Sequence, residues 1–339
     1  MKKEDIRIQG VIMHILDSTV GMPVLSDREL EFGSDLAEFL REHIYRVVSG
    51  DDCKKCYFHQ KESDVYHMLE QYSEDVFVEM SRDLANNLYQ IMNSNVDIPS
   101  ADLLVVRFTE RQHPYLAILK MNYKESFTHR SKKAEDGNTN ELIRYKTILP
   151  TEKQRIQEAA VVDLKDLSVL AIEKPYPVNG ERTDYFTFLF LKCSSERSSK
   201  DKLNIVTKAV ERVQNAHYDE NKQYEKNMEA KNIIYQELEE KGGFSVAQIG
   251  EKIFKDEPEL KEQFREKMIA KDIIREEVMP QDEKTFKKYE TQVIRTDSGI
   301  EIKIPMKEYN DPASVEFVTE DDGTTSVLIK NIGRLQARI

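Results

Sequence analysis

The residue pattern closest to a metal site is Cys53-Lys-Lys-Cys56, with His59 three residues further on. A structural zinc site takes four ligands and usually draws on two such closely spaced pairs. The sequence has no second cysteine pair, and the third cysteine lies far along the chain. His43 or His67 could supply another ligand. We expect two free thiols in a polar loop, with neither a metal centre nor a redox pair.

Carboxylates that could bind Mg²⁺ and orient a water molecule occur at Asp163 and at Glu173-Lys174, in neighbouring strand candidates. The acidic–any–Lys spacing typical of metal-dependent nucleases is missing, because Lys174 follows Glu173 directly. Adjacent side chains in a strand point to opposite faces of the sheet. A metal-dependent nuclease therefore stays open only as a secondary alternative.

Motifs of nucleotide and acyl-transfer enzymes are absent from the sequence. It contains no G-x-x-x-x-G-K, G-x-G-x-x-G or G-x-S-x-G pattern. Twelve glycines in 339 residues leave little material for a loop that cradles phosphates. We expect a protein that is not an enzyme and uses no cofactor.

A basic segment over residues 120–155 is the best candidate for nucleic-acid binding. It carries nine positive and five negative side chains, with four aromatic or histidine residues interleaved. Such a composition can follow a phosphate backbone, since each neutralised phosphate releases a counterion. The other interpretation is an ordinary solvated loop. The predicted DNA contacts in this segment are Lys120, Lys124, Arg130, Lys132, Lys133, Arg144 and Lys146.

Two further segments bear on DNA binding. The C-terminal tail adds Lys330, Arg334 and Arg338 as predicted contacts, although its alternation also suits an edge strand protected by charge. Residues 245–270 form a pair of helices that resembles a helix-turn-helix in spacing. The second of these helices is slightly acidic, whereas a recognition helix should be basic. We interpret the pair as a packing or partner-binding element.

The overall charge of −12 argues against nucleic acid only until it is divided by region. Residues 1–100 carry a net charge of −9, and residues 101–200 carry +3. Because potentials are screened over roughly 10 Å at 0.1 M salt, a local basic patch can act on an acidic protein. Three cysteines suggest a reducing cytoplasm. No apolar run is long enough to cross a bilayer, and because no apolar stretch follows Met1-Lys-Lys-Glu-Asp we expect no secretory signal.

The hydrophobic periodicity predicts an α+β fold in two domains. Residues 1–197 should form a mainly antiparallel sheet with packed helices, and residues 198–339 a helical domain that ends in β-hairpins. Expected strands include residues 6–16, 102–109, 114–123, 141–149, 157–164, 168–173 and 185–192. Residues 50–61 and 131–140 are expected to be polar loops. A helical pattern over residues 65–91 contains a candidate break at Ser73.

The sequence Tyr185-Phe-Thr-Phe-Leu189, followed by a helical domain, is the sharpest point of a resemblance that covers nearly the whole chain. With residues 6–16, 34–48, 102–123 and 159–164, it is similar to the 37-kDa nucleoid-associated protein family of bacteria, the NdpA or YejK type. This family often has a basic residue just before the tyrosine, where this chain has Asp184. The resemblance implies a cytoplasmic, nucleoid-located protein that binds double-stranded DNA and contacts the replication or topology machinery.

The leading hypothesis is therefore a non-enzymatic, homodimeric DNA-binding protein without base-specific recognition. A first alternative is an acidic scaffold that reaches the nucleoid through a protein partner, which the acidic N-terminal hundred residues favour. The metal-dependent nuclease at Asp163 and Glu173 is the second alternative.

Overall fold

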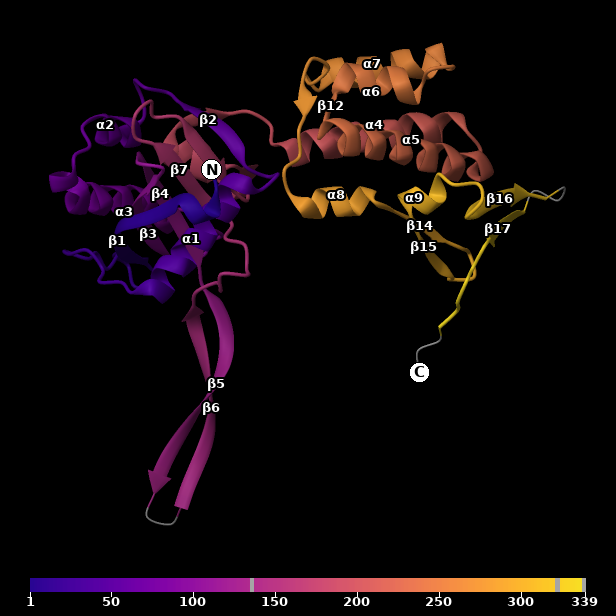
Figure 1. The fold of residues 1–339 in the computed structure, drawn as a ribbon. Coiled ribbons are helices and arrows are strands. Elements are labelled where there is room, and N and C mark those ends of the chain that lie inside the picture. Colours follow the sequence, from indigo (N-terminus) through magenta and orange to yellow (C-terminus); the bar gives the residue numbers. More distant parts are fainter. Residues whose placement is uncertain (135–136, 321–323, 337–339) are drawn as a thin grey trace. The chain divides into compact units, whose positions relative to one another are not determined.

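The computed structural model of the protein describes residues 1–134, 137–320 and 324–336. It divides into two compact units, Met1–Ser198 and Ser199–Ile339. The expected α+β class is confirmed, with a large antiparallel sheet, several helices and C-terminal β-hairpins. Figure 1 shows the helices and strands along the chain.

The first unit is built on a seven-stranded sheet in which every neighbouring pair is antiparallel. Its central strands are almost continuously apolar, which is typical of a sheet that is covered on both faces. The strands in spatial order are β1 (Ile6–Leu16), β3 (Ala101–Glu110), β4 (His113–Asn122), β7 (Glu158–Asp163), β8 (Val169–Ile172), β2 (Lys54–Phe58) and β11 (Cys193–Ser195).

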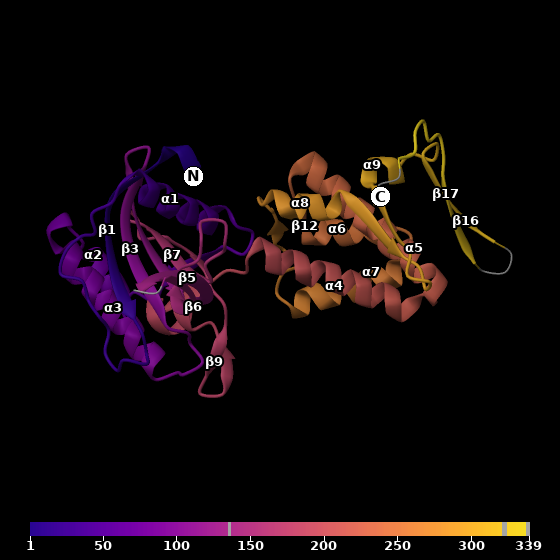
Figure 2. The same cartoon turned by 90° about the horizontal axis from the view of Figure 1, so that it is seen from below.

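Helices cover both faces of this sheet (Figure 2). Helix α1 (Ser34–Ser49) packs Leu40 and Ile44 on the face that carries Leu104 and Val106. Helix α3 (Phe77–Asn93) packs on the other face, together with α2 (Asp64–Glu70). The predicted break at Ser73 is confirmed, because a short 3-10 turn, η2 (Glu74–Val76), separates α2 from α3. A second 3-10 turn, η1 (Lys3–Asp5), precedes β1.

Residues 185–192 do not form the expected strand. They fold into a π-helix, η3 (Phe186–Leu191), after the small hairpin of β9 (Tyr176–Val178) and β10 (Glu181–Thr183). The Thr187 amide and hydroxyl both donate to the Glu173 carboxylate, at 3.0 Å and 2.6 Å. Lys192 then ends the helix with a left-handed backbone, φ 52°. The periodicity of a short apolar run does not distinguish a buried strand from a buried helix. Here the hydrogen bonds of Thr187 to Glu173 favour the helix.

Two expected loops are strands. Residues 54–58 form β2, which pairs with β8 and β11. Of residues 131–140, those that the structure describes, 131–134 and 137–140, belong to the hairpin of β5 (Lys124–Ala134) and β6 (Gly137–Ile148), and the other two lie outside the described residues. These strands are held by backbone hydrogen bonds to their partner strands. Polar side chains do not prevent such pairing, and they give no sign of it in the sequence.

The second unit packs its helices around one apolar core that includes Val206, Ile234 and Phe264. The helical character expected after residue 198 is present as α4 (Ser199–His217), α5 (Glu220–Lys241), α6 (Val246–Ile253) and α7 (Pro258–Ala270). A further helix, α8 (Glu283–Tyr289), was not expected. The predicted C-terminal hairpins are also present, β14 (Thr291–Arg295) with β15 (Glu301–Pro305), and β16 (Val315–Thr319) with β17 (Thr325–Ile329). A two-residue pair, β12 (Phe244–Ser245) with β13 (Glu277–Val278), and the short α9 (Met306–Tyr309) complete the unit.

Candidate nucleic-acid interface

The basic segment is a long two-stranded hairpin. Strands β5 and β6 pair from Lys124 opposite Ile148 to Ala134 opposite Gly137, and Figure 1 draws them in magenta, standing away from the seven-stranded sheet. At about 3.3 Å per residue, the 11 residues of β5 give a ribbon roughly 35 Å long. That length matches about one turn of B-form DNA, and a two-stranded ribbon is narrow enough to enter the major groove.

Strand alternation distributes the polar and apolar side chains over both faces of the hairpin. Phe127 lies opposite Arg144 in the register, and Arg130 lies opposite Glu141. Successive residues of a strand point to opposite faces, so Arg130 and Lys133 lie on different faces of the ribbon. Positive charge is therefore available on both sides of the hairpin.

Two carboxylates neutralise part of this charge. Lys132 pairs with Glu141 at 2.7 Å, and Arg144 pairs with Glu125. Both pairs are half-exposed, so each is worth no more than about 1 kcal/mol and can exchange for a phosphate. The cations of the hairpin that have no carboxylate within 4 Å, among the residues described, are Lys124, Arg130, Lys133 and Lys146.

Large apolar side chains on the hairpin are exposed to solvent. Phe127 is 66% exposed, Leu142 78% and Tyr145 50%. The Arg144 guanidinium lies 5.9 Å from the centroid of the Phe127 ring, a cation–π contact. A two-stranded hairpin is at best marginally stable by itself in water, so these side chains indicate a surface that a partner covers.

The structure does not bring Lys120 to this surface, and its prediction as a DNA contact is wrong. Its side chain is fully buried. Strand β4 is paired on both sides, and the Lys120 ammonium points into the α3 side of the core, where it donates to the Pro99 carbonyl at 3.1 Å. Glu158, directly opposite on β7, is equally buried, with its Oε2 3.8 Å from the Lys120 nitrogen. The charge of a lysine that is buried beside a carboxylate is paired inside the protein and cannot reach a phosphate.

The predicted contacts of the C-terminal tail belong to the second unit. Lys330 pairs with Glu316, and Arg334 is exposed. Arg338 lies outside the described residues. The tail is therefore a separate patch within its own unit, with one of its cations already paired.

The carboxylates considered for a nuclease lie in different clusters. Asp163 accepts a hydrogen bond from His113 at 2.6 Å, whereas Glu173 is held by Thr187 and by Lys54 at 3.2 Å. In the antiparallel β7–β8 pair, Asp163 and Glu173 lie at opposite ends, separated by roughly 15 Å of strand. They cannot share a metal ion, so these two carboxylates do not form the site that the nuclease alternative requires. No group of three potential metal ligands of the His, Cys, Asp or Glu type occurs among the described residues.

The Cys53-x-x-Cys56 pair lies at strand β2 of the sheet and not in the expected polar loop. Cys56 lies on β2 and is buried, while Cys53 is half-buried just before it. Burial raises the pKa of both thiols to about 12. They are therefore protonated at neutral pH, a state in which cysteine is neither a good metal ligand nor a good nucleophile.

A family model described as nucleoid-associated protein YejK matches residues 12–335 of the 339. The chain belongs to this YejK family of nucleoid-associated proteins. A search of curated proteins found no significant match. The matched range extends over both units and includes the residues of β5–β6 and of the C-terminal hairpins.

Membership in the YejK family gives the chain a nucleoid-associated role and a nucleoid location. Within the described ranges, none of the helices has the length and apolar character needed to cross a lipid bilayer.

The sequence indicated the cations of the hairpin and the aromatic residues Phe127 and Tyr145 between them, but Leu142 was not expected as part of the site. Phe127 and Tyr145 stand between lysines and arginines in the sequence, and Leu142 follows Glu141 directly. In a polar segment, an apolar residue that alternates with charged ones is the available signal for a ribbon with an exposed apolar side chain.

Proposed function

We propose that this protein binds double-stranded DNA without sequence preference, through the β5–β6 hairpin. The observation that carries the proposal is the combination, on one ribbon, of four cations without a carboxylate partner among the described residues and three exposed apolar side chains. Cations track the phosphates, and apolar side chains can insert between base steps from a groove. The nucleoid-associated role of the family supports this assignment.

The proposal includes a homodimer in the bacterial cytoplasm. Four cations without a carboxylate partner among the described residues of one hairpin give a salt dependence of only about −3.6 in the plot of log affinity against log salt, since each phosphate contact adds roughly −0.9. Two hairpins in one particle double the contacts and add avidity. Light scattering coupled to size-exclusion chromatography measures this state directly, and a monomer at micromolar concentration contradicts it.

The direct test is charge reversal at the cations that have no carboxylate partner. Arg130→Glu with Lys133→Glu should lower the affinity for a 30-base-pair duplex by tenfold or more in 50 mM salt. The matched control is Lys61→Glu with Lys165→Glu, which places the same charge change on exposed residues outside the hairpin. Fluorescence anisotropy measures both. Equal losses in the two double variants would show that general charge, and not the hairpin, governs binding.

The second candidate function is a protein-interaction scaffold that reaches DNA through replication or topology proteins. The ion pairs Lys132–Glu141 and Arg144–Glu125 favour it, because they use two of the six cations of the described hairpin. Phe127 and Leu142 are then the most exposed of its large apolar side chains. A purified protein that does not bind DNA in 20 mM salt, yet binds a purified topoisomerase through the hairpin, would select this function.

A further inference from the structure

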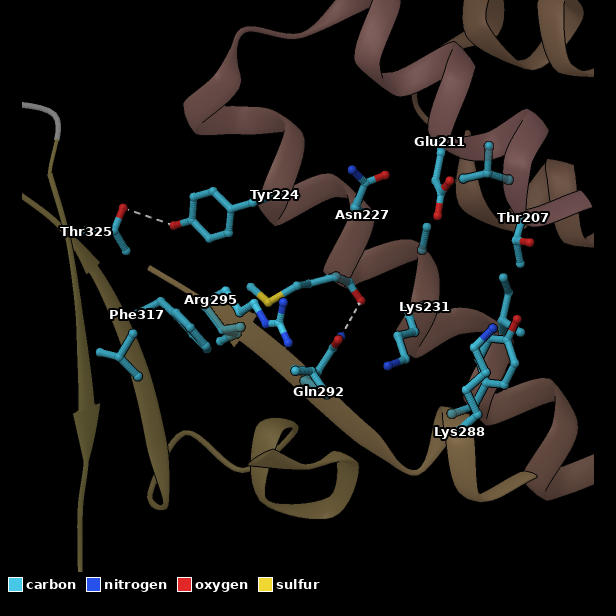
Figure 3. A pocket seen from close by; sticks show the side chains of 18 of the residues that line it. Thr207, Glu211, Tyr224, Asn227, Lys231, Lys288, Gln292, Arg295, Phe317 and Thr325 are labelled. Atoms are coloured by element: carbon cyan, nitrogen blue, oxygen red, sulfur yellow. Dashed lines mark hydrogen bonds between the residues drawn. The ribbon is translucent and has the colours of Figure 1, made fainter. Parts of the chain in front are cut away.

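The second unit contains a cavity of about 660 Å³ between helices α4 and α5, helix α8, strand β14 and the β16–β17 hairpin (Figure 3). This volume lies in the range of small-molecule sites. Three apolar side chains of its lining are buried, Val210 of α4 and Ala230 and Ile234 of α5, and the same helices also contribute polar residues, among them Lys231. A ligand in this cavity would contact hydrocarbon along one side.

Hydrogen bonds within the second unit hold polar side chains of the cavity lining in place. Gln292 is buried and donates to the Met228 carbonyl at 3.0 Å, which ties β14 to α5. The Tyr224 hydroxyl and Thr325 Oγ1 lie 3.1 Å apart, which ties α5 to β17 (Figure 3). The cavity is therefore bounded by connected elements of one unit.

Positive charge predominates among the lining residues. They include Lys231, Lys288 and Arg295 but a single acid, Glu211. Arg295 already pairs with Glu301. Among the described residues, no carboxylate oxygen lies within 4 Å of the ammonium nitrogen of Lys231 or of Lys288.

Lys231 is poised to accept an anion. Its ammonium nitrogen donates one hydrogen bond to the Thr291 carbonyl at 2.6 Å, so two of its three N–H groups stay available. Burial lowers the pKa of Lys231, and the positive charge of Lys288 lowers it further. A negative group between the two lysines would relieve the repulsion between them and offset the cost of burying the charge.

We propose that this cavity binds a small amphipathic anion, with a carboxylate or phosphate head at Lys231 and Lys288 and an apolar body along Val210, Ala230 and Ile234. The lining therefore offers both the cationic and the apolar contacts that such a molecule needs. The site belongs to the second unit and is independent of DNA binding by the β5–β6 hairpin.

The test uses the full-length protein and the fluorescent probe 8-anilinonaphthalene-1-sulfonate, an aromatic monoanion. We expect saturable binding with one probe per chain. Lys231→Gln with Lys288→Gln should raise the dissociation constant at least tenfold. The control, Lys284→Gln with Lys287→Gln on the same helix α8, should change it less than twofold, because neither residue lines the cavity. Equal effects of the two double variants would overturn the proposal.

Competition on the unsubstituted protein tests the head group without any variant. Dodecanoate should displace the probe at concentrations at least tenfold lower than dodecan-1-ol, which has the same chain and no charge. Equal displacement by the two compounds would overturn the requirement for an anion. Loss of probe binding in Phe127→Ala with Leu142→Ala would place the probe on the exposed hairpin and also overturn the proposal.

Discussion

Lys120 and Glu158 face each other across β4 and β7, with 3.8 Å between Lys120 Nζ and Glu158 Oε2 and no exposure of either side chain. Burial lowers the pKa of Lys120 to about 8, against the opposing effect of the Glu158 charge. Burial likewise raises the pKa of Glu158. Each residue supplies the countercharge that makes the burial of the other tolerable.

Removing one partner of this pair should destabilise the first unit strongly. Lys120→Met leaves the Glu158 carboxylate buried without its countercharge, and we expect the free energy of unfolding to fall by about 3–5 kcal/mol. Lys120→Met combined with Glu158→Leu should cost much less than the sum of the two single changes. Urea unfolding measures all three. A single variant within 1 kcal/mol of the unsubstituted protein would contradict the buried position of Lys120.

A second prediction concerns acid sensitivity through His14, which is fully buried on β1. Its Nδ1 accepts the Ser26 amide at 3.1 Å, so Nε2 carries the proton and donates to Ser81 Oγ at 3.0 Å. Burial lowers the pKa of His14 to about 4, and the Arg82 charge adds to this. The ring is therefore neutral in the folded protein.

Between its ordinary pKa of 6.5 and about 4, His14 binds a proton only when the chain is unfolded. The contribution of neutral His14 to the free energy of unfolding should therefore be fully present above pH 6.5. It should fall as the pH decreases towards 4, by up to about 3 kcal/mol. Urea unfolding across this range should show a steeper loss for the unsubstituted protein than for His14→Gln. Parallel curves would mean that His14 does not titrate with folding.

A third prediction separates the exposed ring of Phe127 from the charges around it. Because the side chain is mostly solvent-exposed, Phe127→Ala should change the free energy of unfolding by less than about 0.5 kcal/mol. The same change should lower the affinity for duplex DNA about tenfold and reduce DNA bending, because the ring no longer inserts between bases. Energy transfer between the labelled ends of a duplex measures the bend. Phe127→Tyr is the matched control and should keep both properties.

The parts of the fold that were predictable are those whose signal is local. Strands β3 and β4 are apolar runs joined by a two-residue turn, Arg111-Gln112, and were expected almost within their observed bounds, as were the C-terminal hairpins. Helix α3 shows its apolar side at regular spacing. In each case, period and turn residues agree within one segment, so no distant partner is needed.

The parts that were not predictable depend on distant residues. The run from Phe186 to Leu191 is equally suited to strand and helix, and Glu173, 14 residues before Thr187, fixes the π-helix. Lys120 counts as a surface lysine in any tally of charge, yet Glu158 is its cross-strand partner in the core. Strand β6 was expected only from residue 141 onward, and its polar start and the partner strand β5 are defined by their pairing.

The β5–β6 hairpin can be removed cleanly, which gives the most direct test of the DNA-binding proposal. Lys124 and Ile148 are paired across its base, so an Asn-Gly turn that replaces residues 125–147 should close the gap without disturbing β4 or β7. Unfolding of the shortened protein in urea should stay within about 1 kcal/mol of that of the full chain, which confirms that the sheet remains intact.

The deciding measurement is the affinity of this shortened protein for a 30-base-pair duplex as a function of salt. We predict that binding in 50 mM salt falls at least a hundredfold. The slope of log affinity against log salt should become shallower by about 2.7 for each hairpin removed, because Arg130, Lys133 and Lys146 are lost while Lys124 remains. Unchanged affinity and an unchanged slope would contradict the account and place the DNA contact elsewhere on the molecule.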